Sequence, residues 1–438
     1  AYGYVMKYLD ERGIQNVTPR AEIDRLTVGC TGIKRTTGQH PGGMVVVPDK
    51  YTVEDFTPIQ YPSNDESKGT YTTHFDFKNS LHDTLLKLDE LGHDNPTLYK
   101  YLEDSTGIPV MDVDLSDPLL YQLITSTEPI GVSPEDIDCQ TGTLAIPEMG
   151  TPFVIGMLLE AQPKTFADLL RISGLSHGTD VWLGNAQTLI EQGLATISTA
   201  ICTRDDIMIY LIQMGLDSEQ SFTIMESVRK GKGLKEEWKE EMRAHDVPEW
   251  YIDSCLKIKY MFPKAHAAAY VMMAWRIAYC KVYYPLAYYA AYFSIRATGF
   301  NYEIMCQGRE RLTYFQKDYE RRKDSLSKKE QDVYRDMKIV QEMYARGFDF
   351  TPIDIYRAKP DRFQIIDGKL MPALNTIDGM GDNAAIAVAE AAKDGKFLSR
   401  DDFRQRTKAT KTVIDLMGDL GLLGDMPESN QLSLFDFA

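Results

Sequence analysis

The longest apolar stretch of the chain, residues 265–297, places the strongest constraint on the fold. Its apolar residues recur at helical spacing, but Arg276, Lys281 and Pro285 interrupt it. A helix that crosses a membrane needs ~20 nearly uninterrupted apolar residues. The stretch therefore predicts helices buried in a globular core, with no membrane association.

The rest of the chain of 438 residues divides into zones of different composition. Residues 1–105 contain Gly, Pro and β-branched runs, such as 44–48, 71–77 and 85–91, which predict strands joined by turns. Residues 106–345 carry apolar residues mainly at helical spacing. The remainder predicts a short strand, two small helical units and a polar tail.

Within the helical zone, four segments fit the helical period: 186–200, 204–229, 235–258 and 265–296. The stretch 302–345 is rich in Arg, Lys and Glu. It predicts a solvated connecting helix.

Charge and cysteine usage limit the class of protein. The net charge of −16 argues against indiscriminate nucleic-acid binding, although only the contacting face of a DNA enzyme must be basic. The six cysteines form no CxxC pair, and the seven histidines form no HExxH motif. These patterns predict reduced thiols in a cytoplasmic protein and no zinc site.

The strand-like run 85–91 places two charged side chains on one face. Residues alternate faces along a strand, so Lys87 and Asp89 point one way, and Leu86 and Leu88 point the other way. A carboxylate can hold Mg²⁺, and an ammonium can meet a triphosphate oxygen. The same spacing fits a surface ion pair, and spacing alone favours that alternative.

A glycine-rich segment before the first expected strand contains His40, Gly42 and Gly43. Paired glycines let the backbone approach a ligand closely, and Lys34, Arg35 and His40 could donate hydrogen bonds to it. A generic turn explains this segment equally well.

A second basic segment contains Arg229, Lys230 and Lys232 with two glycines at the end of a helical run. Such a tip could bind phosphates. Basic residues followed by glycine are also typical of an ordinary helix C-terminus, which is the somewhat favoured alternative.

Ring-bearing residues follow Pro263. A helix that begins there places His266 and Tyr270 on one face, with Lys264 in its first turn. The alanines between them leave room for a planar group to stack on the tyrosine. A satisfied polar network in the core is an equally good alternative.

The C-terminal part carries two binding patterns. Gly379 and Gly381 precede an Ala-rich helix, as in the helix-hairpin-helix pattern, which presents N–H groups to a duplex backbone. The polar tail ends in apolar residues that are typical of a short peptide filling a pocket on a partner. The residues of this peptide are Gln431, Leu432, Leu434 and Phe435.

Together these motifs resemble the bacterial family C replicative DNA polymerases, the alpha subunit of DNA polymerase III, and most closely its PolC type. The resemblance covers essentially the whole chain, in the family's order. The stretches that carry it are 32–43, 86–93, 171–182, 262–270 and 431–435.

The resemblance implies a multidomain α+β fold. It would contain part of a polymerase-β-like nucleotidyltransferase palm (1–105), mainly α-helical fingers (106–300), a connecting helical segment (301–345), a helix-hairpin-helix duplex-binding domain (346–424) and a flexible clamp-binding tail (425–438).

The resemblance also implies roles for individual residues. Asp89 matches the third catalytic carboxylate of the family, which binds Mg²⁺ in a site of two ions. His40, Gly42 and Gly43 belong to a palm loop, and Gly379 and Gly381 to the DNA-binding hairpin. The nucleotide-binding set is Lys87, Arg171, Ser176, His177, Arg229, Lys230, Lys232, Lys264, His266 and Tyr270, and the clamp-binding set is Gln431, Leu432, Leu434 and Phe435.

The activity implied is template-directed addition of dNTPs to a primer 3′-hydroxyl by two-metal phosphoryl transfer, in the bacterial cytoplasm. The partners implied are primer–template DNA, dNTP and a sliding clamp, the beta subunit. Clamp-loader subunits are a further partner that the resemblance allows.

One departure from the family concerns its first two catalytic aspartates, an Asp-x-Asp pair. Residues 1–105 contain no such pair, and Asp112 and Asp114, which have the spacing, follow Asp89 instead of preceding it. The sequence is therefore expected to be a piece of a longer protein and inactive alone. Two alternatives stay open: a non-catalytic DNA- and clamp-binding module, or an unrelated nucleotide-dependent transferase that uses Lys87 and Asp89.

Overall fold

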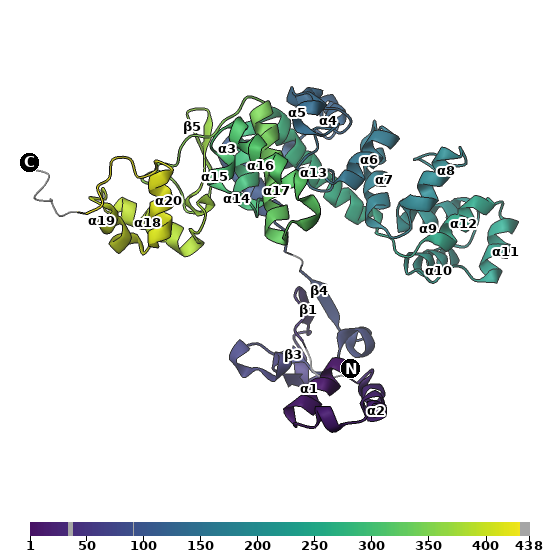
Figure 1. Cartoon of the computed structure of the whole chain (residues 1–438). Coiled ribbons are helices and arrows are strands. Elements are labelled where there is room, and N and C mark those ends of the chain that lie inside the picture. The colour runs from purple at the N-terminus through teal and green to yellow at the C-terminus, as the bar shows by residue number, and fades with distance from the viewer. Residues whose placement is uncertain (34–37, 91, 430–438) are drawn as a thin grey trace, which may run out of the picture. The chain divides into compact units, whose positions relative to one another are not determined.

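The computed structural model describes residues 1–33, 38–90 and 92–429. The chain divides into two compact units, Ala1–His93 and Asp94–Ala438. Each unit, drawn as a ribbon in Figure 1, has its own core of buried apolar side chains.

Within its described residues, the first unit combines two α-helices with two antiparallel strand pairs. Val5, Leu9 and Ile23 form its small helical core. Strand β1 pairs with β4, and β2 pairs with β3, so the strands expected within 44–48 and 85–91 are confirmed. The elements are α1 (Tyr2–Glu11), α2 (Arg20–Cys30), β1 (Gly43–Val46), β2 (Ile59–Gln60), β3 (Thr72–Thr73) and β4 (Leu86–Asp89).

The strand expected over residues 71–77 is wrong except at Thr72–Thr73. The Asp76 carboxylate accepts a hydrogen bond from the backbone N–H of Asn79 at 2.9 Å and starts a helical turn over Phe77–Leu81. A short polar side chain that bonds to the backbone in this way competes with strand pairing.

The second unit is mainly helical. Its α3 begins inside the expected palm segment, yet Leu98 and Leu102 of this helix pack in the core of the second unit. Its elements up to residue 295 are α3 (Asn95–Thr106), α4 (Pro118–Leu123), α5 (Pro134–Ile137), α6 (Pro152–Ala161), α7 (Phe166–His177), α8 (Gln187–Glu191), α9 (Arg204–Gln213), α10 (Ser218–Arg229), α11 (Glu236–Ala244), α12 (Glu249–Lys257), α13 (Lys264–Tyr283) and α14 (Pro285–Ile295). The later elements are α15 (Tyr302–Met305), α16 (Arg309–Arg321), α17 (Lys328–Ala345), β5 (Gln364–Ile366), β6 (Lys369–Met371), α18 (Asp382–Lys393), α19 (Arg400–Thr407) and α20 (Lys411–Asp419).

The segments expected at 186–200, 204–229 and 235–258 are shorter or divided. Within the first of them, α8 ends at Glu191. Gly215, with a φ of 98°, separates α9 from α10, and Pro248 precedes α12 in an extended conformation. Glycine and proline interrupt the helical backbone even where the apolar period continues.

The apolar stretch 265–297 forms α13 and α14, which meet at Pro285. Helix α13 contributes Trp275 and Ala278 to one core, and Ile277 to the next. The predicted buried helical core is therefore confirmed. Across the described parts of the chain, no helix is long and apolar enough to cross a bilayer.

Helix α17 is not the solvated helix that its charge pattern predicted. It buries Val333, Met337, Val340 and Met343 in the same core as α14. These residues recur at spacings of three and four, which is the spacing of one helix face. The many charged residues between them concealed this apolar face in the sequence.

A fully buried ion pair joins α13 to α17. Lys281 Nζ lies 2.8 Å from Glu342 Oε1, and both side chains are 0% exposed. Lys281 also donates to the carbonyl oxygens of Gly142 at 2.8 Å and Leu144 at 2.6 Å, and the Tyr289 hydroxyl donates to Glu342 at 2.6 Å. Burial lowers the pKa of Lys281, and the carboxylate opposes that shift. The lysine that interrupts the apolar stretch is thus surrounded by acceptors.

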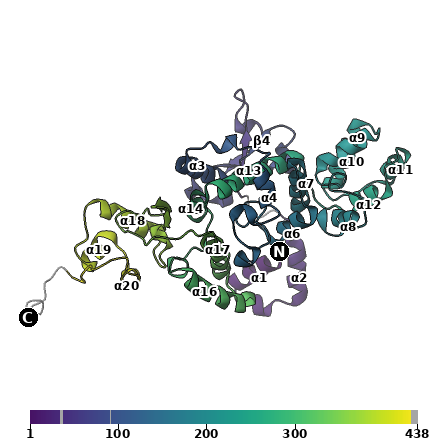
Figure 2. The same ribbon diagram turned by 90° about the horizontal axis from the view of Figure 1, so that it is seen from above.

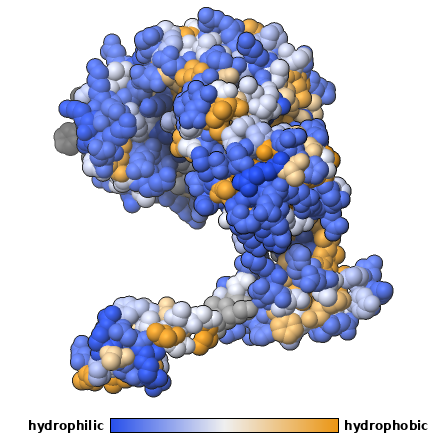
Figure 3. Space-filling view, turned by 90° about the vertical axis from the view of Figure 1, so that its right-hand side faces the viewer, coloured by the Kyte–Doolittle hydropathy of each residue, from blue (hydrophilic) through white to orange (hydrophobic). Residues whose placement is uncertain are grey.

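A third core occupies the C-terminal part, where α18, α19 and α20 pack together (Figures 1 and 2). The antiparallel pair of β5 and β6 connects it to the preceding core, because Leu370 belongs to the second core and Met371 to the third. On the face shown in Figure 3, hydrophilic residues predominate and apolar ones form small separate patches, as is usual for enclosed cores.

Removing one member of the buried ion pair should strongly destabilise the chain. We expect Lys281→Met to lower the free energy of unfolding by about 3–5 kcal/mol, because Glu342 would stay buried without a counter-charge. Adding Glu342→Leu should recover part of this loss. Urea unfolding of the whole chain, followed by tryptophan fluorescence, measures both variants.

The matched control is Lys328→Met, which removes a cation whose side chain is 82% exposed and paired with Asp332. Its effect should stay below about 1 kcal/mol. A double variant that is no more stable than Lys281→Met alone would contradict the coupling.

Candidate active site

Lys87 and Asp89 lie side by side at the end of β4, as their spacing predicted. Lys87 Nζ is 2.9 Å from Asp89 Oδ1, and the two side chains are 23% and 53% exposed. The ammonium also lies 5.4 Å from the ring centroid of Phe77. Asp89 is therefore oriented by a cation and keeps an exposed edge for another ligand.

The glycine-rich segment adjoins this ion pair, because Gly43 is the cross-strand partner of Asp89. The Gly42 N–H donates to His40 Nδ1 at 3.1 Å. A Cβ atom at position 43 would lie 2.8 Å from His40 Nδ1 and 3.1 Å from Lys87 Cδ. A side chain at position 43 would displace one of these residues. Glycine therefore allows the glycine-rich segment to pack against the pair of Lys87 and Asp89.

The opposite face of the strand pair is apolar. Met44 opposes Leu88, and Val46 opposes Leu86. All four side chains are exposed. The alternation along the strand correctly predicted that the leucines point away from Lys87 and Asp89.

Asp89 has the chemistry of a single metal ligand. Mg²⁺ prefers carboxylate oxygens, and this carboxylate is half exposed. Among the described residues, however, no three His, Cys, Asp or Glu side chains gather as a metal site would require. The described residues therefore provide one ligand of a divalent-metal site and do not form a complete site.

In the second unit, Glu226 gathers three cations. Its carboxylate receives hydrogen bonds from Arg229 Nε and, at 2.8 Å, from Arg229 Nη2. Lys230 Nζ lies 2.9 Å away, and Arg204 Nη1 lies 3.7 Å away. The hydrogen bonds from Arg229, together with Lys230, lower the pKa of Glu226 to about 2. The carboxylate therefore stays charged and holds the cations in one place.

The first turn of α13 adjoins these cations through α9. The Arg204 N–H donates to the carbonyl oxygen of Phe262 at 3.1 Å. The Lys264 N–H donates to Asp205 at 2.6 Å, and Lys264 Nζ lies 3.9 Å from Asp206. Lys264 is thus held at the start of α9, the helix that contributes Arg204 to the cations around Glu226.

Three rings stack along one side of α13. The Phe262 and His266 centroids are 4.8 Å apart, and the His266 and Tyr270 centroids are 4.1 Å apart with 28° between the planes. The predicted placement of His266 and Tyr270 on one face is confirmed. His266 itself covers one face of the tyrosine, where the sequence suggested room for a planar group.

His177, at the end of α7, meets this stack. Its ring centroid lies 6.1 Å from that of His266 and 6.4 Å from that of Tyr270. His177 Nε2 is 2.6 Å from Glu148 Oε2, and Nδ1 is 2.7 Å from the Ser173 carbonyl oxygen. The hydrogen bond to Glu148 raises the pKa of His177, whereas burial and the charge of His177 lower the pKa of His266. His177 thus favours the protonated form, whereas its neighbour His266 favours the neutral form.

Three other predicted residues lie at the margin of this region. Ser176 Oγ is 3.1 Å from the His177 ring, so the structure brings these two together. Arg171 is paired with Asp168 of its own helix at 3.5 Å. The Lys232 side chain is exposed.

Gly379 and Gly381 directly precede α18, as expected for a hairpin. Gly379 adopts a φ of 79°, and Gly381 is the N-cap of the helix. A Cβ atom on Gly379 would lie 3.3 Å from Val413. Both glycines and Lys329 line a cavity of about 420 Å³.

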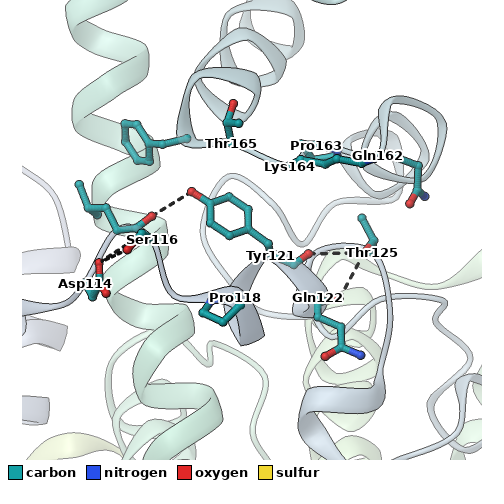
Figure 4. Close-up of a pocket in the computed structure, with 12 residues that line it drawn as sticks. Asp114, Ser116, Pro118, Tyr121, Gln122, Thr125, Gln162, Pro163, Lys164 and Thr165 are labelled. Atoms are coloured by element: carbon teal, nitrogen blue, oxygen red, sulfur yellow. Dashed lines mark hydrogen bonds between the residues drawn. The ribbon is translucent and has the colours of Figure 1, made fainter.

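A larger cavity, of about 850 Å³, lies between α4 and the start of α7 (Figure 4). Its polar groups bond to one another: Tyr121 donates to the Leu115 carbonyl oxygen at 2.9 Å, and the Ser116 hydroxyl donates to Asp114 at 2.7 Å. None of the predicted site residues lines it, so it is separate from the candidate site.

Sequence reasoning missed Glu148, Arg204 and Glu226. Glu226 lies three and four residues before Arg229 and Lys230, a spacing that pairs charges on a helix face and could have revealed it. Glu148 reaches His177 from a distant loop, so no local pattern could identify it.

The predicted clamp-binding residues lie outside the described residues, as do Lys34 and Arg35. The clamp-binding residues are Gln431, Leu432, Leu434 and Phe435.

Comparison with protein families places three domains along the chain. Residues 6–92 match the bacterial DNA polymerase III alpha NTPase domain, and residues 95–246 match the finger domain of the same subunit. Residues 347–432 match a helix-hairpin-helix motif. The expected helix-rich, multidomain fold with such a motif is therefore confirmed.

Curated relatives agree along the whole chain. It is 53% identical to a PolC-type DNA polymerase III of Caldanaerobacter subterraneus subsp. tengcongensis, covering 99% of this chain and 31% of the relative. The PolC-type proteins of Bacillus cereus and Clostridium perfringens are 52% and 51% identical, each covering 99% of this chain and 30% of the relative. The chain thus spans less than a third of the length of these relatives. By this similarity the chain belongs to the bacterial family C DNA polymerases, among the PolC-type DNA polymerase III proteins.

Proposed function

We propose that this chain is part of a template-directed DNA polymerase that adds dNTPs to a primer 3′-hydroxyl on primer–template DNA. The observation that best supports this is the basic region around Glu226 beside a row of rings, in a chain 53% identical to a PolC-type DNA polymerase III. Cations neutralise charge that builds on a triphosphate, and rings offer flat apolar surface to a nucleotide.

Residues 106–300 would act as the fingers, with Arg229 as the main triphosphate contact. Glu226 engages its Nε and Nη2 atoms, which leaves the Nη1 group without a partner among the described residues. A guanidinium held in this way can present its other edge to phosphate oxygens. Lys230, Lys232 and Lys264 would add charge that positions the triphosphate for attack.

Residues 1–105 would form part of a polymerase-β-like nucleotidyltransferase palm. Asp89 would supply one oxygen ligand to a divalent metal, and Lys87 would orient that carboxylate and contact a phosphate. When bound, two Mg²⁺ ions would supply activation of the primer hydroxyl and stabilisation of the leaving oxygens. The loop of His40, Gly42 and Gly43 would let the backbone approach the substrate.

The remaining segments would hold the DNA and the replication machinery. Residues 346–424 would contact the duplex backbone through the hairpin of Gly379 and Gly381. Residues 425–438 would bind a sliding clamp, and clamp-loader subunits are proposed as further partners. The protein would act in the bacterial cytoplasm, at the replicating chromosome.

Asp89→Asn, in the complete polymerase, should reduce nucleotide incorporation to background while primer–template binding stays nearly unchanged. The amide keeps the shape of the side chain but loses the charge that binds a metal. Single-turnover primer extension and a DNA-binding assay measure the two effects. Asp83→Asn, at a side chain 97% exposed, is the control; wild-type turnover in Asp89→Asn would rule out the metal role.

Arg229→Ala should raise the apparent KM for dNTP by about tenfold or more, since a charge-assisted phosphate contact contributes roughly 1.5–3 kcal/mol. Steady-state primer extension at varied dNTP concentration measures the change. Arg243→Ala is the matched control, because Arg243 is paired with Glu249 on an exposed surface. An unchanged KM and rate would mean that the basic segment is an ordinary helix C-terminus with no role in binding the triphosphate.

Replacing Leu434 and Phe435 with alanine should abolish processive synthesis with a sliding clamp and spare distributive synthesis. The apolar side chains would fill the clamp pocket, so their loss removes the tether and not the chemistry. Product lengths with and without clamp measure this, with Ser433→Ala as control. Survival of clamp pull-down in the double variant would refute the role of the tail.

A further inference from the structure

The loop of residues 141–150, which carries Glu148, has an unusual backbone. Ala145 and Glu148 adopt φ values of 60° and 66°, in the left-handed region that residues with a side chain rarely occupy. Such conformations persist only where the surrounding structure enforces them, and they are concentrated at functional sites.

Close packing holds the 141–150 loop in place. A Cβ atom on Gly142 would lie 2.3 Å from Leu123 Cδ1, and one on Gly150 would lie 2.8 Å from the Thr143 carbonyl oxygen. Ile146, between these glycines, is buried. The loop therefore has little freedom to adopt another path.

The buried lysine of α13 also holds this loop in place. Lys281 donates to the carbonyl oxygens of Gly142 and Leu144, and its charge is balanced by Glu342. Lys281 follows Tyr270 by eleven residues on α13, which is about 16 Å along a helix. Helix α13 thus carries Tyr270 and anchors the loop that presents Glu148.

Glu148 contacts the ring cluster through His177. The His177 Nε2 atom is 2.6 Å from the Glu148 carboxylate, and Nδ1 is directed at the Ser173 carbonyl oxygen at 2.7 Å. Both ring nitrogens therefore face acceptor oxygens, an arrangement that favours a proton on each nitrogen, and the Ser176 hydroxyl lies 3.1 Å from Nδ1. The titratable groups that face this ring are Glu148 from the loop, and His266 and Tyr270 from α13.

We propose that Glu148 is a positioning residue that holds His177 as a fixed cation beside the Tyr270 and His266 rings, on a loop braced by Lys281 and Glu342. The proposal rests on the proposed function, because the cation would face the nucleotide bound by the fingers. The imidazolium of His177 would attract the negatively charged triphosphate. By raising the pKa of His177, Glu148 would set the pH above which this attraction is lost.

Glu148→Gln in the complete polymerase tests the proposal. The amide removes the charge that keeps His177 protonated, so the KM for dNTP should rise roughly fivefold relative to wild type near pH 8. Near pH 6, where a histidine with its ordinary pKa of about 6.5 takes up a proton unaided, the ratio should return toward one. The kcat ratio should change much less than the KM ratio.

Two further variants make the outcomes separable. His177→Gln should raise KM at both pH values, because no proton can restore a cation there. A loss in Glu148→Gln that is equal at pH 6 and pH 8, or no loss, would overturn the positioning role. If Arg229→Ala also leaves KM unchanged, the proposed function fails as well, whereas a raised KM in Arg229→Ala alone confines the failure to Glu148.

An NMR titration of the imidazole resonances of this chain provides a readout independent of activity. The resonance lost in His177→Gln identifies His177 among the seven histidines. Its midpoint should lie above the ordinary value in the unmodified chain and move downward in Glu148→Gln. A midpoint that is the same in both proteins would overturn the proposal.

Discussion

The buried contact between Lys281 and Glu342 is the constraint on which the second unit depends. Two charges without solvent contact are tolerated only when their geometry satisfies nearly every donor and acceptor. Here the ammonium meets the carboxylate and two carbonyl oxygens of the 141–150 loop. Helix α13, helix α17 and this loop are therefore coupled, because separating any of them would leave a buried charge or carbonyl group without this partner.

Carboxylates organise the cations of this acidic chain. Glu226 holds Arg229 and Lys230, Glu148 holds His177, and Asp89 holds Lys87. A net charge of −16 initially argued against a nucleic-acid enzyme. In the structure these carboxylates lie next to the cations that are proposed to bind phosphate, and they fix the geometry of those cations.

The sequence predicted those features that depend on local period. The buried helices at 265–297, the pairing of charges on β4 and the shared face of His266 and Tyr270 all follow from spacing along one element. Features that depend on distant contacts could not be predicted. Glu148 approaches His177 across the fold, and the buried face of α17 was concealed by the charges on its other faces.

The exposed apolar face of β1 and β4 has a consequence for how the first unit behaves outside its native surroundings. Met44, Val46, Leu86 and Leu88 form this face, and within the described residues the sheet has only these two strands. A two-stranded pair is marginally stable by itself, and its open edges can recruit strands from other molecules. Expressed separately, the first unit would therefore be prone to concentration-dependent aggregation, beginning on the side opposite to Lys87 and Asp89.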